Sequence, residues 1–257
     1  MVGSSSRIDE ASSLCFSDAS AAPSPKADNT LSSQPIGNGN PVPLRILPLG
    51  DSITWGYLST DGNGYRQDLL NMLSGTPVQY IGSQRSGNMT DNFNEGHPGA
   101  IISQIAGFAN QSLPQRPNLI LLMSGTNDMI KDVDPANAPQ RLGNLLDECV
   151  AACPDAVLIT AQLTPTTNAT ATMFMDIFNP TIPGFVASRV KAGKKVMTVD
   201  MRAYVNTTEL ADGLHPTDFG YNQMAIGWHD AIQQAVSMGW ITPPVLVNGT
   251  SRRGLYL

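Results

Sequence analysis

Short apolar runs alternate with helical patterns along most of this chain, and that alternation restricts its fold more than any other feature. The run at 119–123 is apolar at all five positions, which is typical of a strand covered on both faces of a sheet. A similar run at 44–49 ends at Gly50, where a strand would stop. The other expected strands are 78–81, 157–161 and 195–199.

Helical patterns lie between these runs. We expect helices over 65–73, 101–108, 138–153 and 217–237, and a helix within 171–192 that is interrupted near Pro180 and Pro183. Strands separated by helices favour a parallel sheet with right-handed crossovers. The predicted fold class is therefore α/β: a three-layer α/β/α sandwich around a flavodoxin-like, five-stranded parallel sheet.

The two ends of the chain differ from its centre. In residues 1–43, 18 positions are Ser, Pro or Gly, so this arm is expected to be disordered because it has too little apolar surface to bury. Residues 44–242 are expected to form one domain, and 243–257 a tail. The first ten residues lack a basic region followed by an apolar segment, so no secretory signal is recognised.

Charge and cysteine content exclude several classes of protein. With 15 Lys plus Arg against 21 Asp plus Glu, the net charge of −6 disfavours nucleic acid as a partner. No run of 18 apolar residues exists to span a membrane. Cys149 and Cys153 are four positions apart on a predicted helix, so a local disulfide and two buried thiols both remain possible, while Cys15 has no evident partner. No cluster resembles a zinc site.

Three polar clusters follow predicted strands, at 50–54, 124–128 and 212–216. The carboxyl ends of parallel strands meet at one edge of a sheet, so these clusters are expected to converge there. Ser52 is a poor nucleophile unless a base takes its proton, and the imidazole of His215 is such a base. Asp212, three residues earlier, can orient that imidazole. Asn127 has an amide that can stabilise a developing oxyanion.

In these clusters the chain resembles the SGNH (GDSL-type) hydrolases. The matching motifs are Gly50-Asp51-Ser52, Gly125-Thr126-Asn127-Asp128 and Asp212 with His215, and Gly99 best matches the family's second motif. The resemblance implies a triad of Ser52, His215 and Asp212. It also implies an oxyanion hole formed by Ser52, Gly99 and Asn127, with no metal or organic cofactor.

A narrower resemblance is to carbohydrate esterase family 3, which includes acetylxylan esterases. It is carried by 50–56, 64–66, 80–83 and the Glu-Gly-His-x-Gly sequence at 95–99, although Ala100 stands where that branch often has Trp. It implies removal of a short acyl group, such as acetyl, from a carbohydrate such as acetylxylan. The alternatives are a lysophospholipase or general short-chain esterase, and a non-catalytic carbohydrate-binding protein on the same fold.

Five further residues are candidates for contacting substrate or supporting the site: Asp51, Trp55, Arg66, His97 and Asp128. Arg66 either braces the site or is a surface charge at a helix start, His97 is expected to shape the cleft, and Asp128 is expected to be structural. His229 is interpreted as a structural residue. The aromatic residues that could line a sugar site are Trp55, Tyr57, Tyr65 and Tyr80.

Five Asn-x-Ser/Thr sequences bear on where the protein works. They occur at Asn88, Asn110, Asn168, Asn206 and Asn248, and they fit an extracellular glycoprotein. The expected partner is an ester substrate, an acylated carbohydrate, and the expected state is a monomer.

Overall fold

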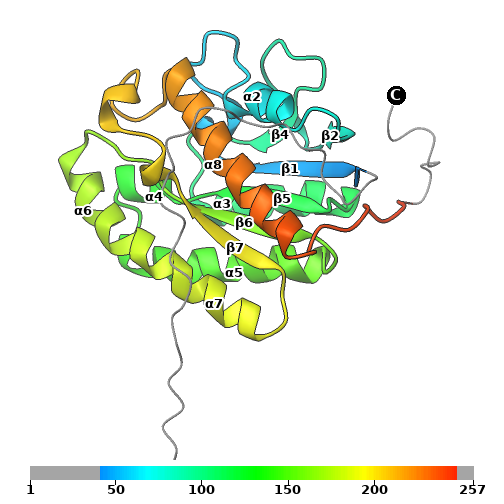
Figure 1. Ribbon diagram of the computed structural model, residues 1–257. Helices are drawn as coiled ribbons and strands as arrows, with labels where there is room; N and C mark the ends of the chain where they lie inside the picture. The colour runs from blue at the N-terminus through cyan, green and yellow to red at the C-terminus, as the bar shows by residue number, and fades with distance from the viewer. Residues whose placement is uncertain (1–40, 248–257) are drawn as a thin grey trace, which may run out of the picture.

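One mixed sheet organises the computed structural model, which describes residues 41–247 (Figure 1). Its strands run in the order β3-β4-β1-β5-β6-β7, and β2 pairs with the other end of β1. Their bounds are β1 Leu44–Gly50, β2 Val78–Tyr80, β3 Gln84–Arg85, β4 Phe93–Gly96, β5 Leu119–Met123, β6 Val157–Gln162 and β7 Val196–Asp200. Residues 1–40 of the predicted arm and 248–257 of the predicted tail lie outside the described residues.

The five predicted strands are confirmed. They are parallel and lie in the flavodoxin-like order β2-β1-β5-β6-β7. The prediction that the sheet has only five strands is wrong, because β4 adds a parallel pairing to the end of β1 and β3 pairs antiparallel with β4. Strand β4 reads Phe-Asn-Glu-Gly, so no apolar run marks it in the sequence.

The helices form two layers on the faces of the sheet. Helices α2 (Tyr65–Met72) and α8 (Asp218–Ser237) pack together on one face. Helices α3 (Ile102–Ser112), α5 (Ala138–Ala152) and α7 (Ile182–Lys191) cover the other (Figure 1). The remaining helices are α1 Ser52–Trp55, α4 Thr126–Ile130 and α6 Ala169–Phe178, and the 3₁₀ turns are Leu113–Gln115, Pro135–Asn137, Asn179–Thr181, Met201–Ala203 and Thr207–Glu209. The sandwich prediction is therefore confirmed.

The predicted break near Pro180 and Pro183 is also confirmed. Helix α6 ends at Phe178, a 3₁₀ turn spans Asn179–Thr181, and α7 starts at Ile182. Each proline lies in the first turn of the element that follows, where its missing N–H removes no helical hydrogen bond.

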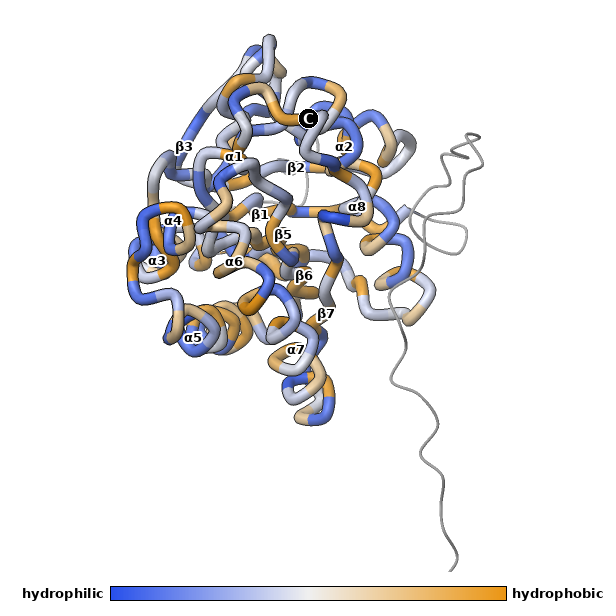
Figure 2. Tube along the Cα trace, turned by 90° about the vertical axis from the view of Figure 1, so that its left-hand side faces the viewer, coloured by the Kyte–Doolittle hydropathy of each residue, from blue (hydrophilic) through white to orange (hydrophobic). Residues whose placement is uncertain are grey.

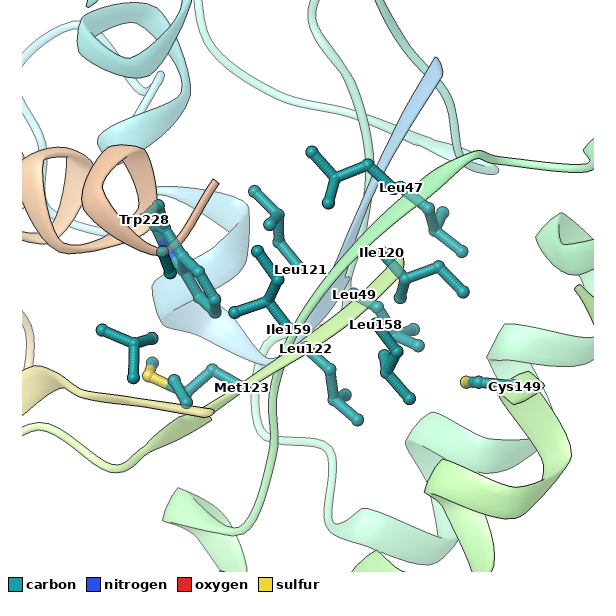
Figure 3. Packing of buried hydrophobic residues seen from close by; sticks show 14 of the residues in the cluster. Leu47, Leu49, Ile120, Leu121, Leu122, Met123, Cys149, Leu158, Ile159 and Trp228 are labelled. Atoms are coloured by element: carbon teal, nitrogen blue, oxygen red, sulfur yellow. The ribbon is translucent and has the colours of Figure 1, made fainter. Parts of the chain in front are cut away.

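The central strands are buried between both helical layers. Figure 2 shows the apolar colouring of β5 at the centre of the sheet. Alternate residues of β5 point to opposite faces, so that Leu121 lies toward Trp228 of α8 and Ile120 toward Cys149 of α5 (Figure 3). Cys149 and Cys153 are both buried free thiols, so the possible disulfide is excluded and the alternative of two buried thiols is confirmed. Burial raises the pKa of the Cys149 thiol, which makes it unreactive.

The end of the predicted domain and the start of the predicted tail pack against the amino-terminal end of the sheet. The guanidinium of Arg45 donates to the carbonyl of Val245 at 3.1 Å, and the amide of Asn118 donates to the carbonyl of Thr242 at 2.7 Å. Within 41–247, the helices are all too short or too polar to cross a lipid bilayer.

Candidate active site

Ser52 lies at the end of β1, where the chain turns sharply into α1. A Cβ at position 50 would be 2.5 Å from the carbonyl oxygen of Met123 on β5, so only glycine fits there. The carboxylate of Asp51 then accepts the N–H of Ile53 at 3.0 Å and caps α1. The Gly-Asp-Ser sequence thus places Ser52 on a tight turn at the carboxyl edge of the sheet.

Ser52, His215 and Asp212 form a continuous chain of hydrogen-bonding contacts. The Oγ of Ser52 lies 2.9 Å from Nε2 of His215, and Nδ1 of His215 lies 2.8 Å from Oδ2 of Asp212. Ser52 and His215 are buried, while the side chain of Asp212 is 43% exposed. The geometry brings together the three residues that the sequence predicts as a triad.

The loop that carries Asp212 and His215 is bonded to the segment that follows β6. The carbonyl of Gly213 accepts the N–H of Thr167 at 2.8 Å and the hydroxyl of Thr166 at 2.9 Å. Burial acts to raise the pKa of Asp212, but hydrogen bonds from His215 and Leu214 outweigh it and hold this pKa below its ordinary value. Asp212 is thus ionised where it faces the imidazole.

Asn127 lies on α4, directly after β5, the strand next to β1. Gly125 enters this helix at φ 125°, and a Cβ there would approach the ring of Phe178 to 3.0 Å, so the motif requires glycine. Asn127 is a buried residue, and its side-chain amide makes no hydrogen bond within residues 41–247. Its N–H groups are therefore available to a ligand.

Gly99 lies in the loop after β4, which is tied to the sheet beside Ser52. The N–H of His97 donates to the carbonyl of Gly50 at 3.0 Å. Gly99 itself adopts φ 81°, and Lys131, just after α4, donates to its carbonyl at 2.6 Å. The N–H of Gly99 has no partner among the described residues. The second motif thus supplies a loop with a free N–H near α1 and α4.

Two buried carboxyl groups, those of Asp51 and Asp128, are adjacent in sequence to Ser52 and Asn127. Burial raises the pKa of Asp51 to about 6, although the N–H of Ile53, the hydroxyl of Thr126 and His215 lower it. Asp128 accepts the first N–H of α3, from Ile102, at 2.9 Å and pairs with Arg141 of α5 at 2.9 Å. Asp128 therefore joins three helices and does not contact the triad.

Arg66 is fully buried, so its interpretation as a surface charge is wrong. Its guanidinium donates to the carbonyls of Trp55, Gly62, Ser86 and Asn92, and to the hydroxyl of Ser86, at 2.7–3.3 Å. These bonds fix the end of α1, the loop between α1 and α2, and the loop between β3 and β4.

His97 contacts neither Ser52 nor His215. Its imidazole lies 2.5 Å from a carboxylate oxygen of the buried Glu95 and stacks on the ring of Phe108 with centroids 3.6 Å apart. His97 thus anchors the loop of the second motif. His229 is buried on α8, and its Nε2 lies 3.1 Å from the side-chain nitrogen of Gln233.

The four aromatic candidates separate clearly by burial. Tyr65 and Tyr80 are buried in the core and cannot line a sugar site, while Trp55 is half-buried. Tyr57 is 47% exposed, and its ring centroid lies 4.7 Å from that of His215. The sequence carries no signal for this contact, because Tyr57 lies 158 positions before His215 and outside every motif.

Within residues 41–247, no group of three or more His, Cys, Asp or Glu side chains is placed to hold a metal ion. The arrangement of Ser52, His215 and Asp212 with nearby unpaired N–H groups is suited to acyl transfer through a serine nucleophile.

Comparison with known proteins agrees with this chemistry. The family described as GDSL-like Lipase/Acylhydrolase matches residues 49–223. The structure of a Clostridium thermocellum family 3 carbohydrate esterase is 30% identical with a TM-score of 0.68, covering 76% of this chain and 98% of that one. A carbohydrate esterase family 3 structure from Talaromyces cellulolyticus is 25% identical with a TM-score of 0.64, covering 76% and 99%.

Curated relatives are longer than this chain's matching region. A multidomain esterase of Ruminococcus flavefaciens is 24% identical over 227 residues, which are 74% of this chain and 28% of that protein. A second relative, from Acetivibrio thermocellus, is matched over 56% of its length, so the chain spans about half or less of these proteins. With its family match at 49–223 and a 30% identical structural relative covered almost end to end, the chain belongs to the GDSL-like lipase/acylhydrolase family of carboxylic ester hydrolases.

Proposed function

We propose that this protein removes short acyl groups from an acylated carbohydrate by a serine mechanism. Ser52 attacks the ester carbonyl while Nε2 of His215 takes its proton, and Asp212 orients the imidazole and stabilises its charged form. His215 then protonates the leaving alcohol and activates a water molecule that releases the acid. The 2.9 Å contact between Ser52 Oγ and His215 Nε2 is the observation that carries this proposal.

The oxyanion of the tetrahedral intermediate needs donors that are already in place. We assign this role to the N–H of Ser52, the N–H of Gly99 and the side-chain amide of Asn127. The proposal is supported by the missing partners of the latter two donors in the described part of the chain. Removing a donor of this type costs about 10²–10³-fold in kcat.

Acetyl on a xylan-type polysaccharide is the substrate we favour. This choice is supported by the two carbohydrate esterase family 3 structures that the chain resembles. A lysophospholipase or a general short-chain esterase is the alternative within the same chemistry. A non-catalytic carbohydrate-binding protein is disfavoured, because Ser52 contacts His215 and His215 contacts Asp212, as a serine mechanism requires.

One substrate comparison tests this function. Acetate release from acetylated xylan and fatty-acid release from lysophospholipid are measured with wild-type protein and with Ser52→Ala. Ser74→Ala, which removes an exposed hydroxyl just after α2, is the matched control. We expect acetate release by the wild type and the control, and none by Ser52→Ala. Fatty-acid release without acetate release would replace the carbohydrate substrate, and full activity of Ser52→Ala would overturn the mechanism.

We also propose that the protein works outside the cell. Of its five Asn-x-Ser/Thr sequences, those at Asn88, Asn110, Asn168 and Asn206 lie among the described residues, and each asparagine is exposed. Asn248 lies outside the described residues. Treatment of the protein from the culture medium with an N-glycosidase should lower its mass, and an unchanged mass would contradict glycosylation.

A further inference from the structure

Tyr57 contacts the proposed base, His215, and its side chain is also exposed to solvent. Its centroid lies 4.7 Å from that of His215, with the two rings tilted by 60°. The side chain is nevertheless 47% exposed. Within residues 41–247 no other aromatic ring pairs with a member of the triad. Tyr57 is therefore a solvent-facing wall of the site on the side of His215.

The main chain of Tyr57 is held at both its donor and its acceptor. Its N–H donates to the carbonyl of Ser52 at 3.0 Å. Its carbonyl accepts the hydroxyl of Tyr221 at 2.8 Å, and Tyr221 is buried on α8. The nucleophile and this ring are thus fixed relative to each other, and a ligand that contacts the ring loses little loop entropy on binding.

The residues after Tyr57 form a constrained turn. Leu58 adopts φ 66°, a left-handed conformation that is strained for a non-glycine residue. Thr60 then binds the carboxylate of Asp218 twice, through its N–H and its hydroxyl, each at 2.8 Å. Such strain persists where surrounding contacts impose it, and it is concentrated at binding and catalytic sites.

The position of Tyr57 determines which part of an ester it can meet. In the proposed mechanism, Nε2 of His215 gives its proton to the leaving alcohol, so the carbon atoms of that alcohol lie on the imidazole side of Ser52. The carbonyl oxygen of the ester, which becomes the oxyanion, faces Gly99 and Asn127. Ala100, next to Gly99, is small and buried and offers no ring on that side.

We propose that Tyr57 is a specificity residue that binds the sugar ring of the leaving alcohol by stacking its aromatic face on the C–H groups of a pyranose. This inference rests on the proposed function and deepens it, since it assigns the alcohol subsite. The ring is uncharged and flat, and it suits the apolar face of a neutral sugar. Stacking on Tyr57 therefore strengthens binding only for esters whose alcohol is a sugar ring.

Two acetate esters of different alcohols test the proposal. Kinetics are measured on an acetylated methyl xyloside and on ethyl acetate, which has no ring. Tyr57→Ala and Tyr57→Leu should lower kcat/KM for the xyloside by roughly 3- to 10-fold more than for ethyl acetate, with the difference appearing in KM. Tyr57→Phe keeps the ring and should resemble the wild type on both esters. Phe219→Ala, which removes another exposed ring from α8, is the matched control and should change neither.

The outcomes distinguish an incorrect role for Tyr57 from an incorrect proposed function. Equal losses on both esters would show that Tyr57 acts through His215, and no loss on either would show no contact; both results overturn the sugar-binding role. Unchanged melting temperatures of the variants attribute the losses to binding. A wild type inactive on both esters would overturn the proposed function, and the assignment of Tyr57 with it.

Discussion

Asp212 contacts His215 twice: Oδ1 accepts the backbone N–H of His215 at 2.8 Å, and Oδ2 lies 2.8 Å from its imidazole Nδ1. The carboxylate therefore fixes both the main chain and the ring of the proposed base. A separation of three residues allows this because the loop turns back on itself, with the N–H of Ala211 donating to the carbonyl of His215 at 2.8 Å.

Asp212→Asn should lower kcat by about 10³–10⁴-fold with little change in KM, because an amide favours the wrong tautomer of the imidazole and cannot stabilise its charged form. Steady-state kinetics on p-nitrophenyl acetate measure this. Asp155→Asn removes an exposed carboxylate that pairs with Arg116 at 3.0 Å, and it should keep full activity. A variant at position 212 that retained wild-type kcat would contradict the role of Asp212.

Asn127→Ala should lower kcat by about 10²–10³-fold, since the lost amide acts on charge that develops in the transition state. KM should change little, because the ground-state carbonyl carries less charge. Asn137→Ala is the control, as Asn137 is exposed and its amide binds Asp134. If the variant at position 127 kept kcat and lost only KM, the amide would bind substrate without stabilising the oxyanion.

The buried carboxyl of Asp51 predicts how stability depends on pH. Its pKa is raised from 3.8 to about 6, chiefly by burial. The folded state therefore binds its proton more tightly than the unfolded state. The resulting stabilisation is fully present below pH 3.8 and is lost as the pH rises through about 6.

Asp51→Asn resembles the protonated carboxyl and keeps an oxygen for the N–H of Ile53. It should match the wild type in stability at low pH and exceed it above pH 6 by up to about 3 kcal/mol. Denaturant unfolding over this pH range measures the difference, with Asp155→Asn as the exposed control. A difference that did not vary with pH would rule out this linkage.

Arg66→Lys should destabilise the fold by about 3 kcal/mol, because a single ammonium cannot serve all the acceptors that the guanidinium binds and leaves buried carbonyls unpaired. Arg85→Lys is the control: the guanidinium of Arg85 is exposed and donates to the side-chain oxygen of Asn92 at 2.8 Å, and the substitution should change stability by no more than about 0.5 kcal/mol. Chemical denaturation measures both, and equal stability of the two variants would contradict the bracing role of Arg66.

Much of the fold was predictable because apolar strands and amphipathic helices have clear periodicities. Strand β5 and the cap of α8 illustrate this, since the hydroxyl of Thr217 accepts the N–H of Gly220 as expected of a capping residue. Strand β4 was not predictable, because it is polar and pairs with β1 over only two residues, Leu49 and Gly50. Its existence depends on a tertiary pairing that no local pattern records.

The convergence of Ser52, Asp212 and His215 was predictable because each residue lies in a short motif, one directly after β1 and the other between β7 and α8. The surroundings were not, because they depend on distant contacts. Arg66 is buried by loops that converge from positions 55–92, and Tyr57 lies beside His215 in a loop that is bonded to Tyr221 of α8. The state of Cys149 and Cys153 also needed the structure, since their spacing fits both a disulfide and two thiols.

The most direct test of the central claim is covalent labelling of Ser52 with a fluorophosphonate, which reacts with activated serine nucleophiles. Peptide mass spectrometry should find one reagent molecule on Ser52 in the wild type, none in Ser52→Ala, and much slower labelling in His215→Asn. Labelling of Ser52→Ala at the wild-type rate, or of another serine in the wild type, would show that Ser52 is not the nucleophile.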